Sequence, residues 1–185
     1  MNPEEALVIV IDKLDEQGIP YMIFGSFASN LHGVPRTTHD ADLVIEIDEP
    51  RLQKFAKSLG TDFYLDIDAA QRAVGSKFLF STIHLPSGFK VDFIVRKERA
   101  FSRQEFERRI LANFLNRRCW FATPEDTILS KLEWSKKGES ERQFRDAVNI
   151  AKVQSILNRE YLEQSSKELD VEDLLERLMN EIKKN

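Results

Sequence analysis

Apolar residues in the first third of the chain follow two different spacings, which predict strands interleaved with helices. Helical spacing predicts a first helix that begins at Pro3 and ends at Gly18, a typical C-cap residue. Short apolar runs predict buried strands at residues 21–24 and 41–47, with one or two helical turns at 27–33 between them. Asp48-Glu49-Pro50 has the signals of a helix start, and this helix is predicted to run to about residue 59.

The middle of the chain predicts a β-hairpin, then a helix, then a last strand. Residues 77–85 and 89–95 predict two antiparallel strands joined by a turn at Pro86-Ser87-Gly88. Ser102 is predicted to cap a helix, because residues 102–115 have helical periodicity. Residues 117–123 predict the last strand.

Beyond residue 123 the pattern is helical throughout. Helices are predicted over residues 124–137, 141–153, 158–169 and 171–183, in addition to a short one at 68–74. Strands alternating with helices and then helices alone predict an α/β (α+β) fold. It would have a small mixed β-sheet core in residues 1–122 and a C-terminal helical bundle in residues 123–185.

Composition narrows the class of protein without giving its chemistry. A chain of 185 residues with 42% hydrophobic and 31% charged residues is typical of one globular domain with a helical addition. The single cysteine, Cys119, excludes an internal disulfide and a cysteine-based zinc site. The N-terminus has acids where a signal peptide needs bases, and its apolar run is too short to span a membrane. We therefore expect a cytoplasmic protein with no membrane partner.

Two aspartates stand at the start of the predicted strand 41–47. Residues two apart in a strand point to the same face, so Asp40 and Asp42 are predicted to project together. Like charges at the edge of a core require compensation by a metal ion, a basic side chain or water. Asp92 lies inside a second apolar run, and two strands of one sheet can bring it beside the pair. Three clustered carboxylates are the ligands of a hard cation, usually Mg²⁺, and two such ions can clamp a phosphoryl transfer.

Gly25-Ser26 has the features of a turn that binds phosphate. The dipeptide follows a predicted strand and precedes a predicted helix. Glycine lets the backbone approach a phosphate closely, and the N–H groups of a helix start attract anions. Alone the dipeptide indicates only a turn. The ordered set of Gly-Ser, Asp-x-Asp and a later strand aspartate is far more specific.

That ordered set resembles the signature of the DNA polymerase β-like nucleotidyltransferase superfamily. The signature places Gly-Gly or Gly-Ser after an apolar residue, followed at a distance by Asp-h-Asp-h, where h is apolar. Phe24-Gly25-Ser26 and Asp40-Ala41-Asp42-Leu43 match it, and Asp92 matches the third carboxylate. The resemblance covers roughly residues 19–151.

Within the superfamily, RTTHDADLVI is similar to the Arg-x-Thr-x-Asp-x-Asp form of AbiEii-type enzymes, some of which are toxins of bacterial toxin–antitoxin systems. This form includes Arg36 and Thr38. The same group has a helical lysine and a downstream Arg-Asp, which Lys131 and Arg145-Asp146 match.

The resemblance implies a Mg²⁺-dependent nucleotidyltransferase, which moves a nucleoside monophosphate from an NTP to an acceptor hydroxyl and releases pyrophosphate. Asp40, Asp42 and Asp92 would hold two Mg²⁺ ions, and Asp92 would help to activate the acceptor. The residues implied in nucleotide binding are Gly25 and Ser26 as a triphosphate cradle, Arg36 and Thr38 near the phosphates, Lys131 as a neutralising and catalytic charge, and Asp146 as the residue that positions Lys131 or the nucleotide.

Structural explanations compete with several of these assignments. Asp66 and Asp68 repeat the Asp-x-Asp spacing, but without an upstream Gly-Ser they are interpreted as a helix cap or a surface pair. Lys131 could be a surface lysine beside an apolar stripe. Asp146 could pair with Arg142 four residues earlier. Turn structure alone could explain Arg36 and Thr38.

Two other functions compete with nucleotidyl transfer. One is a catalytically inactive nucleotide-binding or regulatory protein on the same fold. The other is a glycosyltransferase, which also uses Asp-x-Asp but does not explain the upstream Gly-Ser.

The acceptor stays open between tRNA, a protein and a small molecule, and an antitoxin partner is a further expectation. A local excess of Lys and Arg over residues 96–145 favours an extended anion, although the net charge is −4.

Overall fold

The structure is a computed structural model that describes residues 3–183, and the chain divides into two compact units. Unit 1 comprises Met1–Phe24 and Thr38–Phe121, and unit 2 comprises Gly25–Thr37 and Ala122–Asn185. A short segment from the first half of the chain thus belongs with the C-terminal helices. Within residues 3–183 no helix is both long and apolar enough to cross a membrane.

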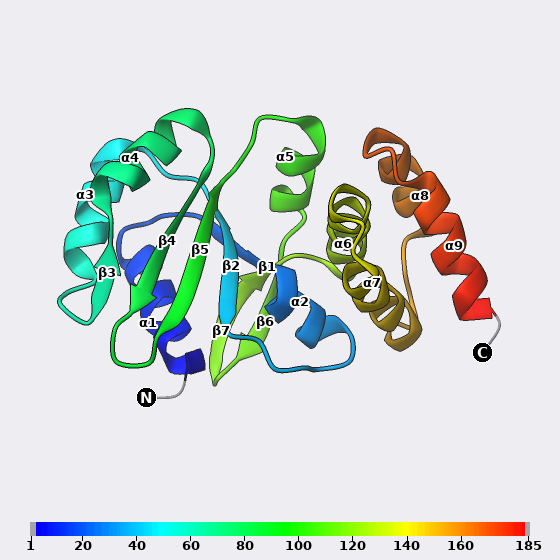
Figure 1. Ribbon diagram of the computed structural model, residues 1–185, viewed down its shortest axis with the longest axis horizontal. Helices are drawn as coiled ribbons and strands as arrows, with labels where there is room; N and C mark the ends of the chain where they lie inside the picture. Colours follow the sequence, from blue (N-terminus) through cyan, green and yellow to red (C-terminus); the bar gives the residue numbers. More distant parts are fainter. Residues whose placement is uncertain (1–2, 184–185) are drawn as a thin grey trace. The chain divides into compact units, whose positions relative to one another are not determined.

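Unit 1 contains all strands of the described chain and four of its helices (Figure 1). The helices are α1 (Pro3–Glu16), α3 (Glu49–Ser58), α4 (Ile67–Ser76) and α5 (Ala100–Glu107). The strands are β1 (Tyr21–Phe24), β2 (Asp40–Ile45), β3 (Phe63–Leu65), β4 (Leu79–His84), β5 (Phe89–Val95), β6 (Ile110–Phe114) and β7 (Arg117–Phe121).

The strands of residues 3–183 form one seven-stranded mixed sheet in the order β3-β4-β5-β2-β1-β7-β6. Strands β2 and β5 are parallel, as are β1 and β7, and the other neighbours are antiparallel. The predicted β4–β5 hairpin and the mixed character of the sheet are confirmed. Because β2 and β5 are central neighbours, residues far apart in sequence lie side by side there.

One face of this sheet carries the apolar core of unit 1. Phe93 of β5 is fully buried and stacks on Phe80 of β4, with ring centroids 5.0 Å apart. Phe55 of α3 meets the same ring edge-on at 5.5 Å, so α3 covers this face. Successive residues of a strand point to opposite faces, and Asp92 therefore projects from the face opposite to Phe93 and α3.

Two predictions about the end of unit 1 are wrong. Residues 110–114 form strand β6, not the second half of a helix, and Ser102 lies inside α5 rather than capping it. Helix α5 follows Arg99, which makes no side-chain cap hydrogen bond. A two-residue turn joins β6 to β7, and both of its residues, Leu115 and Asn116, have positive φ. Such turns usually contain Asn-Gly or Asp-Gly, so the usual sequence signal of this hairpin is missing. The short strand β3 was also not predicted.

Unit 2 is helical among its described residues. Its helices are α2 (Gly25–His32), α6 (Pro124–Gly138), α7 (Glu141–Val153), α8 (Arg159–Glu168) and α9 (Glu172–Lys183), close to the predicted bounds. Helices α2 and α7 approach closely at Gly33, where an added Cβ would lie 3.1 Å from the Ile150 backbone nitrogen. This approach, supported by a hydrogen bond of 2.7 Å from Gln154 Nε2 to the His32 carbonyl oxygen, holds residues 25–37 in the helical unit.

Candidate functional site

The two aspartates of β2 lie beside the aspartate of β5, on the face of the sheet opposite to α3. In the parallel register Asp42 is directly opposite Asp92, and Asp40 is two residues earlier on β2. Asp40 and Asp42 are half-buried, whereas Asp92 is 7% exposed. Residues that are paired across strands share a face, so the three carboxylates project from the same face of the sheet.

Lys90 and Ser81 hold the carboxylate of Asp92. The Lys90 Nζ atom lies 2.7 Å from Asp92 Oδ2, and the Ser81 hydroxyl donates a 2.5 Å hydrogen bond to Asp92 Oδ1. Lys90 is also the register partner of Asp40. The hydrogen bond to Asp92 raises the pKa of Lys90, and the negative charges of Asp92, Asp40 and Asp42 raise it further. A basic side chain thus compensates part of the charge in this cluster.

Thr38 precedes β2 and fixes the first carboxylate. Its hydroxyl lies 3.1 Å from Asp40 Oδ1 and also 3.1 Å from the Asp40 carbonyl oxygen. This is a local Thr-to-Asp contact of the kind that orders a strand entrance. The structure therefore places Thr38 as a support for Asp40, in the same unit as the carboxylates.

The chemistry of these carboxylates fits a hard divalent cation. All three donors are oxygens, and Mg²⁺ prefers carboxylates together with substrate phosphates over a cage made only of protein groups. In the described part of the chain, however, no three His, Cys, Asp or Glu side chains are arranged as a ready-made metal site. In the present arrangement Asp92 Oδ2 faces Lys90, and Asp92 Oδ1 accepts a hydrogen bond from Ser81.

A second charged cluster lies in unit 2, around Asp146 of α7. The Lys131 Nζ atom of α6 is 3.2 Å from Asp146 Oδ2. Arg36 reaches the same carboxylate with two nitrogens, Nη2 at 3.1 Å from Oδ2 and Nε at 3.4 Å from Oδ1. Arg36 Nη2 also donates to the Ser26 hydroxyl at 3.0 Å. Four of the sequence-predicted residues are therefore brought together in one network.

Burial distinguishes this network from a surface cluster. The Lys131 side chain is 5% exposed and that of Asp146 is 10% exposed. Lys131 is thus not a surface lysine. Asp146 forms its ion pairs with Lys131 and Arg36 rather than with Arg142. A buried ammonium needs a paired anion, and Asp146 supplies it.

Gly25 and Asn30 organise the segment from Gly25 to Arg36. Gly25, the first residue of α2, has φ +63°, a left-handed conformation that glycine adopts without strain. The Asn30 side chain clamps the Arg36 backbone, donating to its carbonyl oxygen at 2.7 Å and accepting from its N–H at 3.1 Å. Asn30 therefore fixes the backbone of Arg36, from which the guanidinium group reaches Asp146.

Three residues of these clusters escaped the sequence interpretation: Lys90, Ser81 and Asn30. Lys90 had a usable signal, because it stands two residues before Asp92 and must share its face. Ser81 needed the register of β4 against β5, and Asn30 needed the course of the loop. Neither is encoded in a local pattern.

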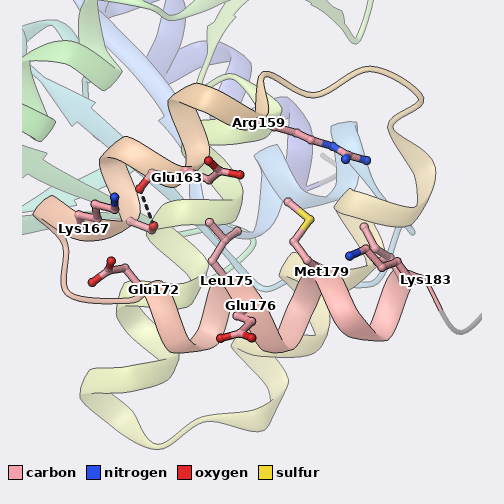
Figure 2. Close-up of a pocket in the computed structure, with 10 residues that line it drawn as sticks. Arg159, Glu163, Lys167, Glu172, Leu175, Glu176, Met179 and Lys183 are labelled. Carbon is pink, nitrogen blue, oxygen red and sulfur yellow. Dashed lines mark hydrogen bonds between the residues drawn. The ribbon is translucent and has the colours of Figure 1, made fainter.

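A separate hollow of about 420 Å³ lies between α8 and α9 of unit 2 (Figure 2). Leu175 and Met179 contribute apolar surface, and the rim carries both bases and acids, including Lys167 and Glu172. None of the sequence-predicted site residues lines it. Its size alone gives no reason to assign the chemistry there.

Comparisons with known proteins identify the fold. No protein-family model matches the sequence, and no curated protein matches it. Among solved structures, a nucleotidyltransferase-like antigenic protein from Paracoccidioides brasiliensis has a TM-score of 0.62 at 20% identity, covering 97% of this chain and 89% of that one. The antibiotic-resistance factor ANT(2'')-Ia has a TM-score of 0.60 at 13% identity, covering 97% and 94%. The crystal structure of ANT(2'')-Ia with adenylyl-2''-tobramycin gives 0.58 at 14%, covering 92% and 98%. The fold is therefore nucleotidyltransferase-like, and the predicted fold class is confirmed.

Proposed function

We propose that this protein is a Mg²⁺-dependent nucleotidyltransferase that transfers a nucleoside monophosphate from an NTP to an acceptor hydroxyl. One observation carries the proposal: on a nucleotidyltransferase-like fold, the register of β2 and β5 gathers Asp40, Asp42 and Asp92 on one sheet face. A structural role does not explain three acids there, because like charges repel each other and resist burial. Phosphoryl transfer explains them, because such sites work by positioning and charge compensation.

In the proposed reaction, the acceptor oxygen forms a bond to the α-phosphorus, and the bond from that phosphorus to pyrophosphate breaks. The acceptor proton passes to the Asp92 carboxylate. Asp40, Asp42 and Asp92 would hold Mg²⁺, which when bound stabilises the negative charge of the phosphates and the leaving pyrophosphate. Thr38 orients the Asp40 carboxylate, and Ser81 orients that of Asp92.

The cluster of unit 2 would serve the nucleotide. We propose that Lys131 and Arg36 supply positive charge for its phosphates, and that Asp146 holds both side chains in place. Gly25 and Ser26 would provide backbone N–H groups and a hydroxyl to the triphosphate.

The acceptor and the biological setting are part of the proposal. ANT(2'')-Ia in complex with adenylyl-2''-tobramycin supports a small hydroxylated acceptor on a fold of this kind. A tRNA and a protein side chain are the other acceptors to be tested. The Arg36-x-Thr38-x-Asp40-x-Asp42 pattern supports an AbiEii-like toxin with an antitoxin partner in the cytoplasm.

Labelling with each α-³²P NTP in the presence of Mg²⁺ tests the function. The acceptors to supply are an aminoglycoside mixture, total tRNA and a protein extract. We expect one fraction to take up label with release of pyrophosphate. Asp42→Asn should lower the rate at least about a hundredfold, equivalent to about 2.7 kcal/mol of lost transition-state stabilisation. Asp68→Asn is the matched control, because Asp68 belongs to an exposed Asp-x-Asp at α4.

Each outcome selects one function. An equal rate in the wild type and Asp42→Asn contradicts the site. NTP binding by calorimetry without pyrophosphate release from any acceptor identifies a catalytically inactive nucleotide-binding protein. Release of a nucleoside diphosphate from a nucleotide sugar, without pyrophosphate, identifies a glycosyltransferase.

A further inference from the structure

The carboxylate patch of unit 1 already contains a cation of its own. Lys90 stands two residues before Asp92 on β5 and opposite Asp40 on β2, so its side chain projects from the same face as the three acids. Its Nζ atom is 2.7 Å from Asp92 Oδ2. An ammonium group at this position neutralises part of a charge that would otherwise be shared by three aspartates.

Both oxygens of Asp92 have partners in this arrangement. Ser81 donates to Oδ1 at 2.5 Å, and Lys90 pairs with Oδ2. A hydroxyl group can remain bonded to a carboxylate that also binds a cation, because each oxygen has two lone pairs. An ammonium group cannot share Oδ2 comfortably with a divalent ion, because the two positive charges repel each other.

Lys90 is placed so that it can leave. Its side chain is 43% exposed, whereas that of Asp92 is 10% exposed. The ammonium therefore sits on the solvent side of the pair, on a flexible four-carbon stem. It can swing into water or onto another anion without disturbing the buried face of the sheet, where Phe93 packs.

We propose that Lys90 is the resident counter-ion of the Asp40–Asp42–Asp92 cluster and that a divalent cation reaches Asp92 only by displacing the Lys90 ammonium. The inference rests on the proposed function, since it concerns the same carboxylates. It makes Lys90 a positioning residue that weakens metal binding to the free protein. The phosphates of a nucleotide would give the displaced ammonium a new partner, so that metal and nucleotide bind together more readily than the metal alone.

Calorimetric titration of the full chain with Mn²⁺, without nucleotide, tests the inference. Lys90→Met removes the charge and keeps most of the length of the apolar stem, and Lys90→Arg keeps the charge. We expect Lys90→Met to bind Mn²⁺ on the order of tenfold more tightly than the wild type, because a unit charge a few ångströms from a divalent ion is removed. Lys90→Arg should stay near the wild type. Lys57→Met, on the exposed side of α3, is the control for loss of one positive charge elsewhere.

Thermal unfolding gives an independent readout that also shows whether each variant is folded. A cation that binds the native state raises Tm, so saturating Mn²⁺ should raise the Tm of Lys90→Met more than that of the wild type. Asp92→Asn should abolish the Mn²⁺-dependent rise. An equal or weaker Mn²⁺ affinity of folded Lys90→Met overturns the inference.

The two proposals fail in different ways. If the wild type transfers label and Asp42→Asn does not, while Lys90→Met shows no gain in Mn²⁺ affinity, only the role of Lys90 is wrong. If Lys90→Met gains Mn²⁺ affinity but the wild type labels no acceptor, the proposed function is wrong and the counter-ion role stands. If neither protein binds Mn²⁺, the carboxylates are not a metal site and the inference is overturned.

Discussion

The two charged clusters of this protein differ in net charge and in burial. The unit 1 cluster gathers three acids and one lysine on a sheet face, and Asp40, Asp42 and Lys90 are all partly exposed. The unit 2 cluster has one acid and two bases, and both Lys131 and Asp146 are nearly inaccessible. Solvent and the partly exposed Lys90 ammonium make an excess of negative charge tolerable in the first cluster. Burial demands close pairing in the second.

This contrast separates what each cluster should do for stability. An exposed set of like charges contributes little to folding and can even oppose it. A buried pair contributes most visibly when one partner is removed, because the other is left in a poorly solvating environment. Substitutions in unit 2 should therefore change stability strongly, and those in the carboxylate patch should change activity with little effect on folding.

The largest stability effect should come from Asp146→Ala. Its removal takes away the anion shared by Lys131 and Arg36, and the cost of breaking a buried pair is about 3 kcal/mol. Urea unfolding followed by circular dichroism measures it. Lys131→Met should cost less, because Asp146 keeps Arg36. Arg145→Ala, at the exposed neighbouring position of α7, is the control; an equal cost for Arg145→Ala would refute the assignment.

The next effect depends on pH and concerns His32 of α2. Burial lowers the pKa of His32, outweighing the 2.8 Å hydrogen bond from its Nε2 to the Ala122 carbonyl oxygen. Below the ordinary pKa of about 6.5 the unfolded chain binds a proton that the native state resists, so stability falls as the pH falls. The slope for one group is at most about 1.4 kcal/mol per pH unit. Urea titrations between pH 7.5 and 5 should show a shallower decline in His32→Gln.

A smaller effect is expected at the Asp-x-Asp that lies outside the site. The Asp66 side chain accepts a hydrogen bond from the Ala69 N–H at 2.9 Å and caps α4, as the sequence interpretation allowed. Asp66→Ala should cost about 1 kcal/mol, the usual value of a lost N-cap. Nucleotide transfer should be unchanged in this variant. A large loss of transfer would show that Asp66 belongs to the active site and is not only a helix cap.

The smallest stability effect should be that of Asp42→Asn. Removing one of three like charges relieves repulsion, so we expect a change within about 0.5 kcal/mol, as for surface substitutions. The same variant should lose transfer activity. Destabilisation as large as that of Asp146→Ala would abolish the contrast between the clusters, because the carboxylates would then be needed for folding.

Local periodicity was sufficient for much of the fold and for part of the site. Period-two geometry put Asp40 and Asp42 on one face, and the cap signals at Asp48 and Asp66 marked helices that the structure contains. The same geometry puts Lys90 on the face of Asp92, because the two residues are two apart on β5. The helical periodicity of residues 110–114 was misleading, because pairing with β7 overrides a weak local preference.

The sequence alone determined which side chains share a strand face or start a helix, because these properties depend on neighbours within a few residues. Only the tertiary structure decided which faces meet. The register of β2 and β5 set Asp42 beside Asp92 and Lys90 beside Asp40. The packing of unit 2 brought Arg36 to Asp146, 110 residues away. Such pairs depend on burial and on the whole packing arrangement, which no local spacing records.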